Sequence, residues 1–192
     1  MAKVFGEIDG KLAEWIARQR MFFVATAPSG DGGHVNCSPK GGPGTFRVVD
    51  GRTVAYLDFV GSGIETIAHL RENGRILIMF CEFEGPPRIV RLHGRGAVTQ
   101  VGDPEFEDLH ARLGFPADPG ARSIVAVAVE RISDSCGYGV PLMRYEDERP
   151  QREAWLDSRL RKHGPHGVLD YVLEQNAESI DGLPGVDVAR LP

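Results

Sequence analysis

Short apolar runs separated by glycine- and proline-rich breaks dominate the first two thirds of the chain. Residues 21–27, "MFFVATA", have the continuous apolar character of a buried strand, and a tight turn leads to a return strand at 34–38. Residues 45–60 form a second hairpin pattern. The dipeptide Asp50-Gly51 at its centre predicts a turn of the primed type, with positive φ angles.

Three further apolar segments follow. Residues 75–81 are apolar throughout, as in a strand buried on both faces. Residues 88–101 read as a long strand whose glycines indicate a bend or bulge, and 123–136 alternates between apolar and polar positions. These segments bring the expected number of strands to six or seven.

Helical spacing appears in five places. Asp9 is the expected cap of a first helix, and further helices are expected at about 62–73 and 103–113. The last third differs from the rest, with two amphipathic helices at about 149–162 and 166–178.

The order of these elements predicts a mainly β (β+α) fold, a six- to seven-stranded antiparallel split β-barrel with one inserted helix and two C-terminal helices. The strand after the inserted helix cannot be the hairpin partner of the strand before it, so the helix crosses over or plugs the barrel. We expect a barrel domain over 1–140 and a helical extension over 141–192, packed on the barrel or on a dimer seam.

Composition narrows the classes of function. The net charge of −5 argues against a nucleic-acid partner, and no apolar run approaches the roughly 18 residues of a membrane span. The N-terminus carries charges where a signal peptide is apolar, and the three cysteines are far apart. We therefore expect a cytoplasmic protein with no membrane partner, no disulfide framework and no metal site.

The segment Phe59 to Gly74, "FVGSGIETIAHLRENG", has two interpretations. In the structural one, Ser62 and Glu65 form a capping box and Gly74 ends the helix in the left-handed conformation. In the functional one, the glycines leave the first amides of the helix open to an anion, and hydroxyls add donors. The anion donors would come from Ser62, Gly63 and Thr66, and the cation from Lys40, Arg88 or Arg91, each of which can equally be a solvated side chain.

Three segments carry a resemblance to a known family: "VNCSPKGG", "VAYLDFVGSGIETIAHLRENGRILIMFCEFEGPPRIVRLHGRGAV" and "SCGYGVP". In this order, over about residues 20–140, the chain resembles the pyridoxamine 5′-phosphate oxidase-like family of FMN-binding split-barrel proteins, in its uncharacterised branch. The resemblance implies a homodimer with FMN at the subunit interface. It makes 1–140 the FMN-binding domain.

The resemblance also implies which positions hold the cofactor. Strand residues would line the flavin ring, a lysine and the serine turn would hold the phosphate, an aspartate would stand at the exit of the next strand, and arginines would approach from the partner subunit. Asn36, Cys37 and Ser38 are the strand residues beside the ring, and Lys40, Ser62 and Thr66 would hold the phosphate. Asp58 stands at the exit of the next strand, and Arg88 and Arg91 are the arginines from the partner subunit.

Two departures from the oxidase stand out. After the serine of the turn, Gly63-Ile64 replaces an Arg-Lys pair, so part of the phosphate grip is absent. The C-terminal segment also lacks the oxidase's substrate-binding Arg-x-His pair. We therefore do not expect pyridoxine or pyridoxamine phosphate as the substrate.

Two site residues keep open alternatives. Tyr138, between two glycines, is either a lid over the flavin or part of a plain turn after the last strand. Cys37 lies in the site strand, but a small buried hydrophobe is the favoured interpretation of its side chain.

Three functions remain open at this point. The leading one is an FMN-dependent oxidoreductase that transfers a hydride or two electrons to or from a small substrate. The second is a non-catalytic module that binds flavin or senses redox state. The third keeps the fold but binds a deazaflavin or haem, the latter through a histidine of the C-terminal helices. Fold alone does not choose between them.

Overall fold

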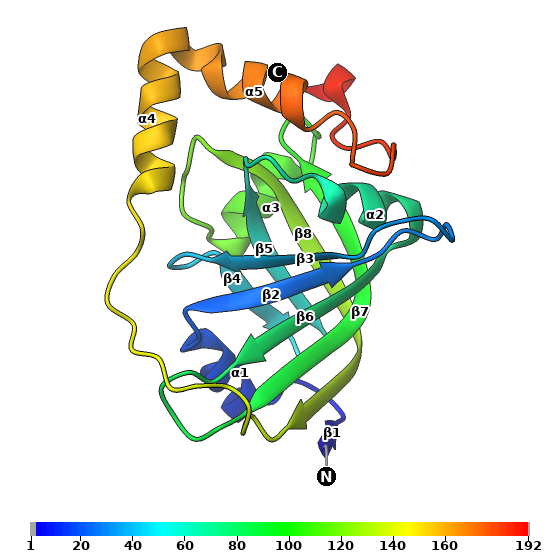
Figure 1. The fold of residues 1–192 in the computed structure, drawn as a ribbon, viewed down its shortest axis with the longest axis vertical. Coiled ribbons are helices and arrows are strands. Elements are labelled where there is room, and N and C mark those ends of the chain that lie inside the picture. Colours follow the sequence, from blue (N-terminus) through cyan, green and yellow to red (C-terminus); the bar gives the residue numbers. More distant parts are fainter. Residues whose placement is uncertain (1–2, 192) are drawn as a thin grey trace.

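The protein is described by a computed structural model that covers residues 3–191. One antiparallel sheet curls into a half-open barrel (Figure 1), which confirms the predicted split-barrel class. Its strands are β1 (Lys3–Phe5), β2 (Met21–Thr26), β3 (Asn36–Gly41), β4 (Phe46–Asp50), β5 (Thr53–Phe59), β6 (Arg75–Cys81), β7 (Ile89–Gln100) and β8 (Ala121–Ser135).

The strand order explains the inserted helix. The sheet runs β3-β2-β6-β7-β8-β5-β4, with β1 paired to the end of β8. Two strands separate β5 from β6, so the connection between them must cross an end of the barrel. Helix α2 (Glu65–Asn73) makes that crossing, as predicted. It ends at Gly74, whose φ of 71° is the left-handed conformation expected of a glycine after a helix.

The β4–β5 hairpin forms where the sequence predicts it, but its turn type differs. Within residues 3–191 positive φ angles occur only at seven glycines, and Gly51 is not one of them. The Asp50 carboxylate instead accepts a hydrogen bond from the Arg52 N–H at 2.7 Å. The predicted primed turn is therefore wrong, because a side-chain turn and a register shift between Val48 and Asp50 close the hairpin.

β3 also departs from its expected bounds. It begins at Asn36 and continues through Lys40 to Gly41, where the sequence pattern indicated a break. Pairing with β2 over six residues, from Met21↔Gly41 to Thr26↔Asn36, overrides the low strand propensity of the prolines and glycines.

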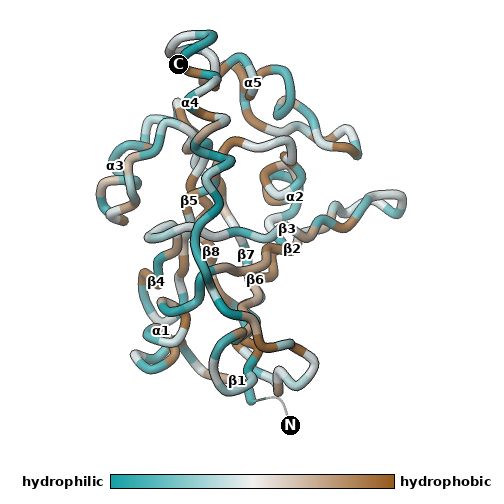
Figure 2. The backbone as a smooth tube through the Cα atoms, turned by 60° about the vertical axis from the view of Figure 1, so that its left-hand side comes forward, coloured by the Kyte–Doolittle hydropathy of each residue, from teal (hydrophilic) through white to brown (hydrophobic). Residues whose placement is uncertain are grey.

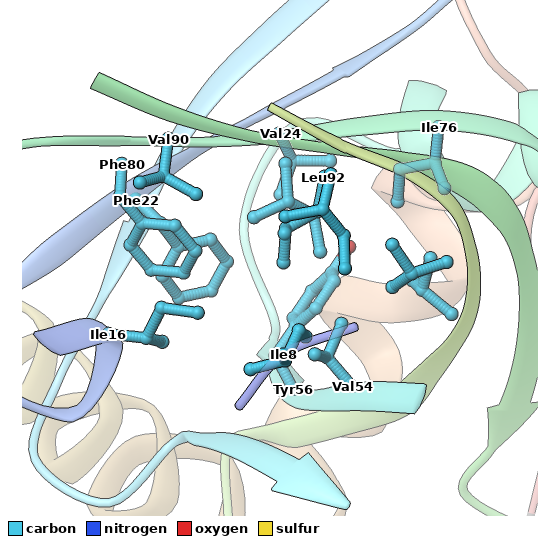
Figure 3. Close-up of a cluster of buried hydrophobic side chains, with 14 of the residues drawn as sticks. Ile8, Ile16, Phe22, Val24, Val54, Tyr56, Ile76, Phe80, Val90 and Leu92 are labelled. Atoms are coloured by element: carbon cyan, nitrogen blue, oxygen red, sulfur yellow. The ribbon is translucent and has the colours of Figure 1, made fainter. Parts of the chain in front are cut away.

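The barrel interior is filled by alternate side chains of the strands and by α1 (Gly10–Ala17), which Asp9 caps as predicted. Figure 3 shows this cluster, with Phe22 and Phe80 side by side. The rings of Phe22 and Tyr56 meet edge to face at 5.4 Å. This packing fixes which face of each strand points outward.

Three further helices lie outside the barrel, the first of them against the outer face of β5 and β8 and the other two at one end. They are α3 (Phe106–Leu113), α4 (Gln151–His163) and α5 (Gly167–Gln175), with short 3₁₀ turns at Gly164–His166 and Val188–Arg190. An extended hydrophilic segment, residues 141–149, leads from the far end of the barrel back to α4 (Figures 1 and 2). None of the described helices is long and apolar enough to cross a membrane.

α4 and α5 bury their apolar faces against α2. Leu156, Val168 and Val172 form a second cluster with Ile64 and Ile67 of the inserted segment. The C-terminal extension therefore packs directly on the part of the barrel where the sequence placed the anion-binding turn.

The glycines of β7 give a matched test of the fold. The register shifts between His93 and Gly94, which confirms the predicted bulge, and a Cβ on Gly94 would lie 2.2 Å from the Ala128 carbonyl oxygen. A Cβ on Gly96 would meet only the flexible end of Leu70, at 2.8 Å. We expect Gly94→Ala to lower the free energy of unfolding by about 3 kcal/mol and Gly96→Ala by about 1 kcal/mol, measured by urea unfolding. Equal losses would contradict this account of the bulge.

Candidate functional site

A buried carboxylate joins β3 to β5 across the split of the barrel. Lys40 Nζ on β3 lies 2.5 Å from Oδ1 of Asp58 on β5, and the two strands are not paired with each other. Asp58 is 1% exposed. The ion pair therefore closes, through side chains, a gap that the backbone leaves open.

Arg122 holds the other oxygen of the same carboxylate. Its Nε and Nη2 donate to Oδ2 of Asp58 at 3.0 and 2.7 Å, and Arg122 is itself only 5% exposed. Burial alone would raise the pKa of Asp58, but Arg122 and Lys40 hold that pKa below its usual value. Asp58 is thus ionised and satisfied by two cations.

Arg122 also positions the turn that precedes α2. Its Nη1 donates to the Gly63 carbonyl at 2.9 Å and to Oδ1 of Asn176 at 2.9 Å. Asn176, at the end of α5, in turn donates to the Gly61 carbonyl at 2.9 Å. The carbonyls of Gly61 and Gly63 are thereby fixed toward the interior.

The amides of this turn are left open. Among residues 3–191, the N–H groups of Gly61, Ser62 and Gly63 have no acceptor. Because a protein N–H without an internal partner must bond to water or to a ligand, these three amides are the turn's available donors.

The predicted capping box is wrong. α2 starts at Glu65, its N-cap is Ile64, and Ser62 makes no capping bond. Glu65 folds back instead, and its Oε2 accepts the Ile64 N–H at 3.0 Å. Ser62 is therefore an exposed turn residue whose hydroxyl is not used by the helix.

A second polar network fixes the side chain of Asn36. Its amide donates to Thr66 Oγ1 on α2 at 2.9 Å, and its carbonyl oxygen accepts the Ser38 hydroxyl at 2.9 Å. Thr26 bonds to Nδ1 of the buried His69 at 3.0 Å, and the ring's Nε2 has no hydrogen-bond partner in the described chain but lies 4.0 Å from Oδ2 of Asp181. Burial lowers the pKa of His69, so the ring is held neutral.

A pocket of about 460 Å³ lies where the turn meets β3. Its walls come from three parts of the chain: the β2–β3 hairpin, the turn before α2, and the C-terminal segment. The lining residues are His34, Val35, Asn36, Cys37, Ser62, Gly63, Glu65 and Ile180.

The structure therefore assembles most of the predicted site residues. One connected region joins β3, Asp58, the turn and the start of α2, and it includes Asn36, Cys37, Ser38, Lys40, Asp58, Ser62, Gly63 and Thr66. Cys37 is exposed on the outward face of β3, so its interpretation as a buried hydrophobe is wrong.

The other three predicted residues lie elsewhere in the protomer. Arg88 precedes β7 at the end opposite α2, where it pairs with Asp134 at 3.2 Å. Arg91 lies on β7 and donates to the Ser135 hydroxyl at 2.9 Å. Tyr138 is 83% exposed in a turn after β8. A role for any of them in cofactor binding stays a prediction that involves a partner subunit.

The donor set fits the phosphate of a flavin. Three open amides and the Ser62 hydroxyl are groups that bind phosphate oxygens. The partly exposed ammonium of Lys40 (22%) is a further phosphate donor, but it lines a separate cavity with Arg20 and Phe59. No cluster of histidine, cysteine, aspartate and glutamate suited to a metal ion occurs in the part of the chain that the structure describes.

Sequence reasoning missed the residues that support the site. Arg122 stands directly before the apolar strand segment "SIVAVAV", and a single charge beside that segment was the sequence feature that could have indicated its role. Asn176 gave no signal, since an asparagine after a helix is ordinarily a cap or a turn residue.

The buried carboxylate generates a stability prediction. Asp58→Asn leaves Arg122 and Lys40 facing a neutral amide, so we expect a loss of about 3–5 kcal/mol of unfolding free energy at pH 7 in urea titrations. Glu130→Gln, which breaks the exposed pair with Arg95, should cost less than about 1 kcal/mol.

The same carboxylate predicts a pH dependence. Because its folded pKa lies below 3.8, the stabilisation is complete above about pH 4 and is lost as the pH falls through the folded pKa. Asp58→Asn should remove that part of the acid transition. An unchanged acid profile would contradict the assignment.

Comparison with known sequences gives a match to one family model and to a curated relative. Residues 8–136 match the profile of the family described as pyridoxamine 5′-phosphate oxidase. A curated relative from Aspergillus flavus, the pyridoxamine 5′-phosphate oxidase family protein ustO, is 38% identical over 195 residues, which cover 96% of this chain and 78% of the relative.

Solved structures with a similar fold are more distant. HupZ from Group A Streptococcus is 23% identical, with a TM-score of 0.48 over 65% of this chain and 91% of its own. A protein of the pyridoxinephosphate oxidase family from Clostridium acetobutylicum is 12% identical, with a TM-score of 0.45 over 64% and 84% of the two chains. On the profile match and the curated relative, the chain belongs to the pyridoxamine 5′-phosphate oxidase family.

Proposed function

We propose that this protein binds FMN and acts as an oxidoreductase on a small substrate. The observation that carries the proposal is the turn before α2, whose carbonyls are anchored by Arg122 and Asn176 while its three amides stay open beside the pocket. Such a turn holds donors in place before a ligand arrives, which lowers the entropic cost of binding an anion.

The neighbouring side chains suit the rest of a flavin. Asn36 and Ser38 are joined by a hydrogen bond, and Asn36 and Cys37 both line the pocket. Bound FMN would supply the electron-transfer chemistry itself, and these residues would orient it and exclude water.

The outer face of the barrel supports a dimer. Across β3, β2, β6 and β7, the directly paired positions Pro39, Phe23, Met79 and Arg91 form one row on the face opposite the core. Each of the last three is only partly buried in the protomer. A second subunit on this face would cover the apolar row and bring a partner arginine toward the cofactor, as the family resemblance implies.

The competing ligands have less support. The histidines of the C-terminal helical region, His163 at the end of α4 and His166 in the 3₁₀ turn after it, are exposed, and neither lines the pocket. A deazaflavin or a non-catalytic flavin module would use the same phosphate donors, so donor screening with the loaded protein separates those alternatives.

Lys40 provides the direct test of flavin binding. We expect FMN to bind and to give flavin absorption bands, and Lys40→Gln to weaken that binding about tenfold, since one charge-assisted bond to phosphate is lost. Fluorescence titration of FMN measures this, with the exposed Lys11→Gln as the matched control. The proposal is contradicted if the unmodified protein binds no flavin, or if it binds FMN with the same affinity as Lys40→Gln and Lys11→Gln.

The dimer is tested at Met79. Burying a carboxylate at the centre of the outer row without a paired cation is strongly unfavourable. Met79→Glu should therefore give a monomer and lower FMN affinity at least tenfold. Sedimentation velocity reports the mass, and Val49→Glu on β4, where valine is already 47% exposed, should remain a dimer. A monomeric unmodified protein that still binds FMN would rule out the shared site.

A further inference from the structure

We propose that Glu65 lowers the positive potential at the phosphate seat, the open amides of Gly61, Ser62 and Gly63, so that the protein holds flavin weakly and exchanges it with solution. The inference rests on the proposed FMN site and concerns how that site treats the phosphate. It assigns Glu65 as a residue that determines specificity.

Glu65 occupies the position where an anion would benefit most from α2. Its Oε2 accepts the Ile64 N–H at 3.0 Å, and its Oε1 accepts the Ile180 N–H at 3.4 Å. The carboxylate thus already satisfies the start of the helix, and it also fixes the C-terminal segment that forms one pocket wall.

The carboxylate also lies against the open amides. A Cβ built on Gly63 would be 3.1 Å from Oε2 of Glu65, so the charge stands next to the turn whose N–H groups are free. A phosphate on those amides would sit within a few ångströms of a fixed negative charge, where repulsion near a protein surface amounts to roughly 1 kcal/mol or more.

The nearby cations are already engaged. Lys40 and Arg122 both bond to Asp58. The Nη1 group of Arg122 donates to the Gly63 carbonyl and to Oδ1 of Asn176. On the opposite wall, His34 pairs through Nδ1 with Asp181 at 2.6 Å. Lys40 and Arg122 therefore face the carboxylate of Asp58, and His34 is held by the carboxylate of Asp181, before any ligand arrives.

A charge-poor seat has a functional consequence. The open amides and hydroxyls recognise the phosphate by hydrogen bonding, but the ammonium of Lys40 is shared with Asp58, so together they give a modest affinity. A flavin held in this way leaves as readily as a substrate does, so we infer that the flavin cycles on and off the protein during turnover.

The experiment compares a flavin with and without its phosphate. FMN and riboflavin are titrated into the unmodified protein, Glu65→Gln and Glu72→Gln. Glu72 lies on the same helix but bonds to the Ser29 N–H at 2.8 Å, outside the pocket, and so controls for the change in net charge. We expect Glu65→Gln to bind FMN about five- to tenfold more tightly, with riboflavin affinity unchanged and no effect of Glu72→Gln.

The outcomes separate this inference from the proposed function. If no protein binds either flavin, both fail. If FMN binds but Glu65→Gln changes FMN and riboflavin affinity alike, or weakens FMN, Glu65 only shapes the pocket and the inference is wrong.

A second variant guards against misfolding of Glu65→Gln. Ser62 is exposed and makes no bond to the rest of the described chain, so Ser62→Lys adds a cation to the turn with little structural risk. It should raise FMN affinity at least fivefold and leave riboflavin affinity unchanged. No gain with Ser62→Lys would show that charge does not limit binding, and would overturn the inference.

Discussion

The buried carboxylate of Asp58 is the interaction on which the site depends. A lone ionised carboxylate in this position would be strongly unfavourable, and two cations from different elements remove that cost. Lys40 ties it to β3, and Arg122 ties it to the turn before α2 and to the end of α5. One charged group therefore sets the spacing between the open edge of the barrel, the turn before α2 and the C-terminal extension. A geometry determined in this way is rigid, because moving any one element would strand a charge.

This arrangement explains why the extension packs where it does. The apolar faces of α4 and α5 need burial, and α2 offers the surface. Hydrophobic packing alone is non-directional and does not fix the angle of approach. The Asn176 side chain does, since it must reach both the Gly61 carbonyl and Arg122. The extension thus acts as a support for the turn, although it lies more than a hundred residues away in the sequence.

The sequence predicts the fold well because strands and helices follow local patterns of apolar residues. β6 and the crossover helix could be read from Arg75–Cys81 and from Gly74, whose roles are set by near neighbours. The site residues of β3 and the turn came from the family resemblance. The helix start was misread at Ser62, because Glu65 bonds to Ile64 and to distant Ile180 in place of a local cap. The sequence did not predict the roles of Arg122 and Asn176 for the same reason, because their hydrogen-bond partners are set by tertiary contacts.

The same non-local bonds link stability to binding. Asp58 and Arg122, which stabilise the turn, neutralise each other, so the remaining positive charge of this cluster is that of Lys40, which is itself bonded to Asp58. Glu65 stabilises the start of α2 and at the same time places a negative charge beside the open amides. A site that bound phosphate tightly would need an unpaired cation here, and an unpaired buried cation would destabilise the barrel. Rigid placement of neutral donors, with the charges balanced internally, is the solution that satisfies both constraints, and it favours a ligand that is recognised by shape and hydrogen bonds more than by charge.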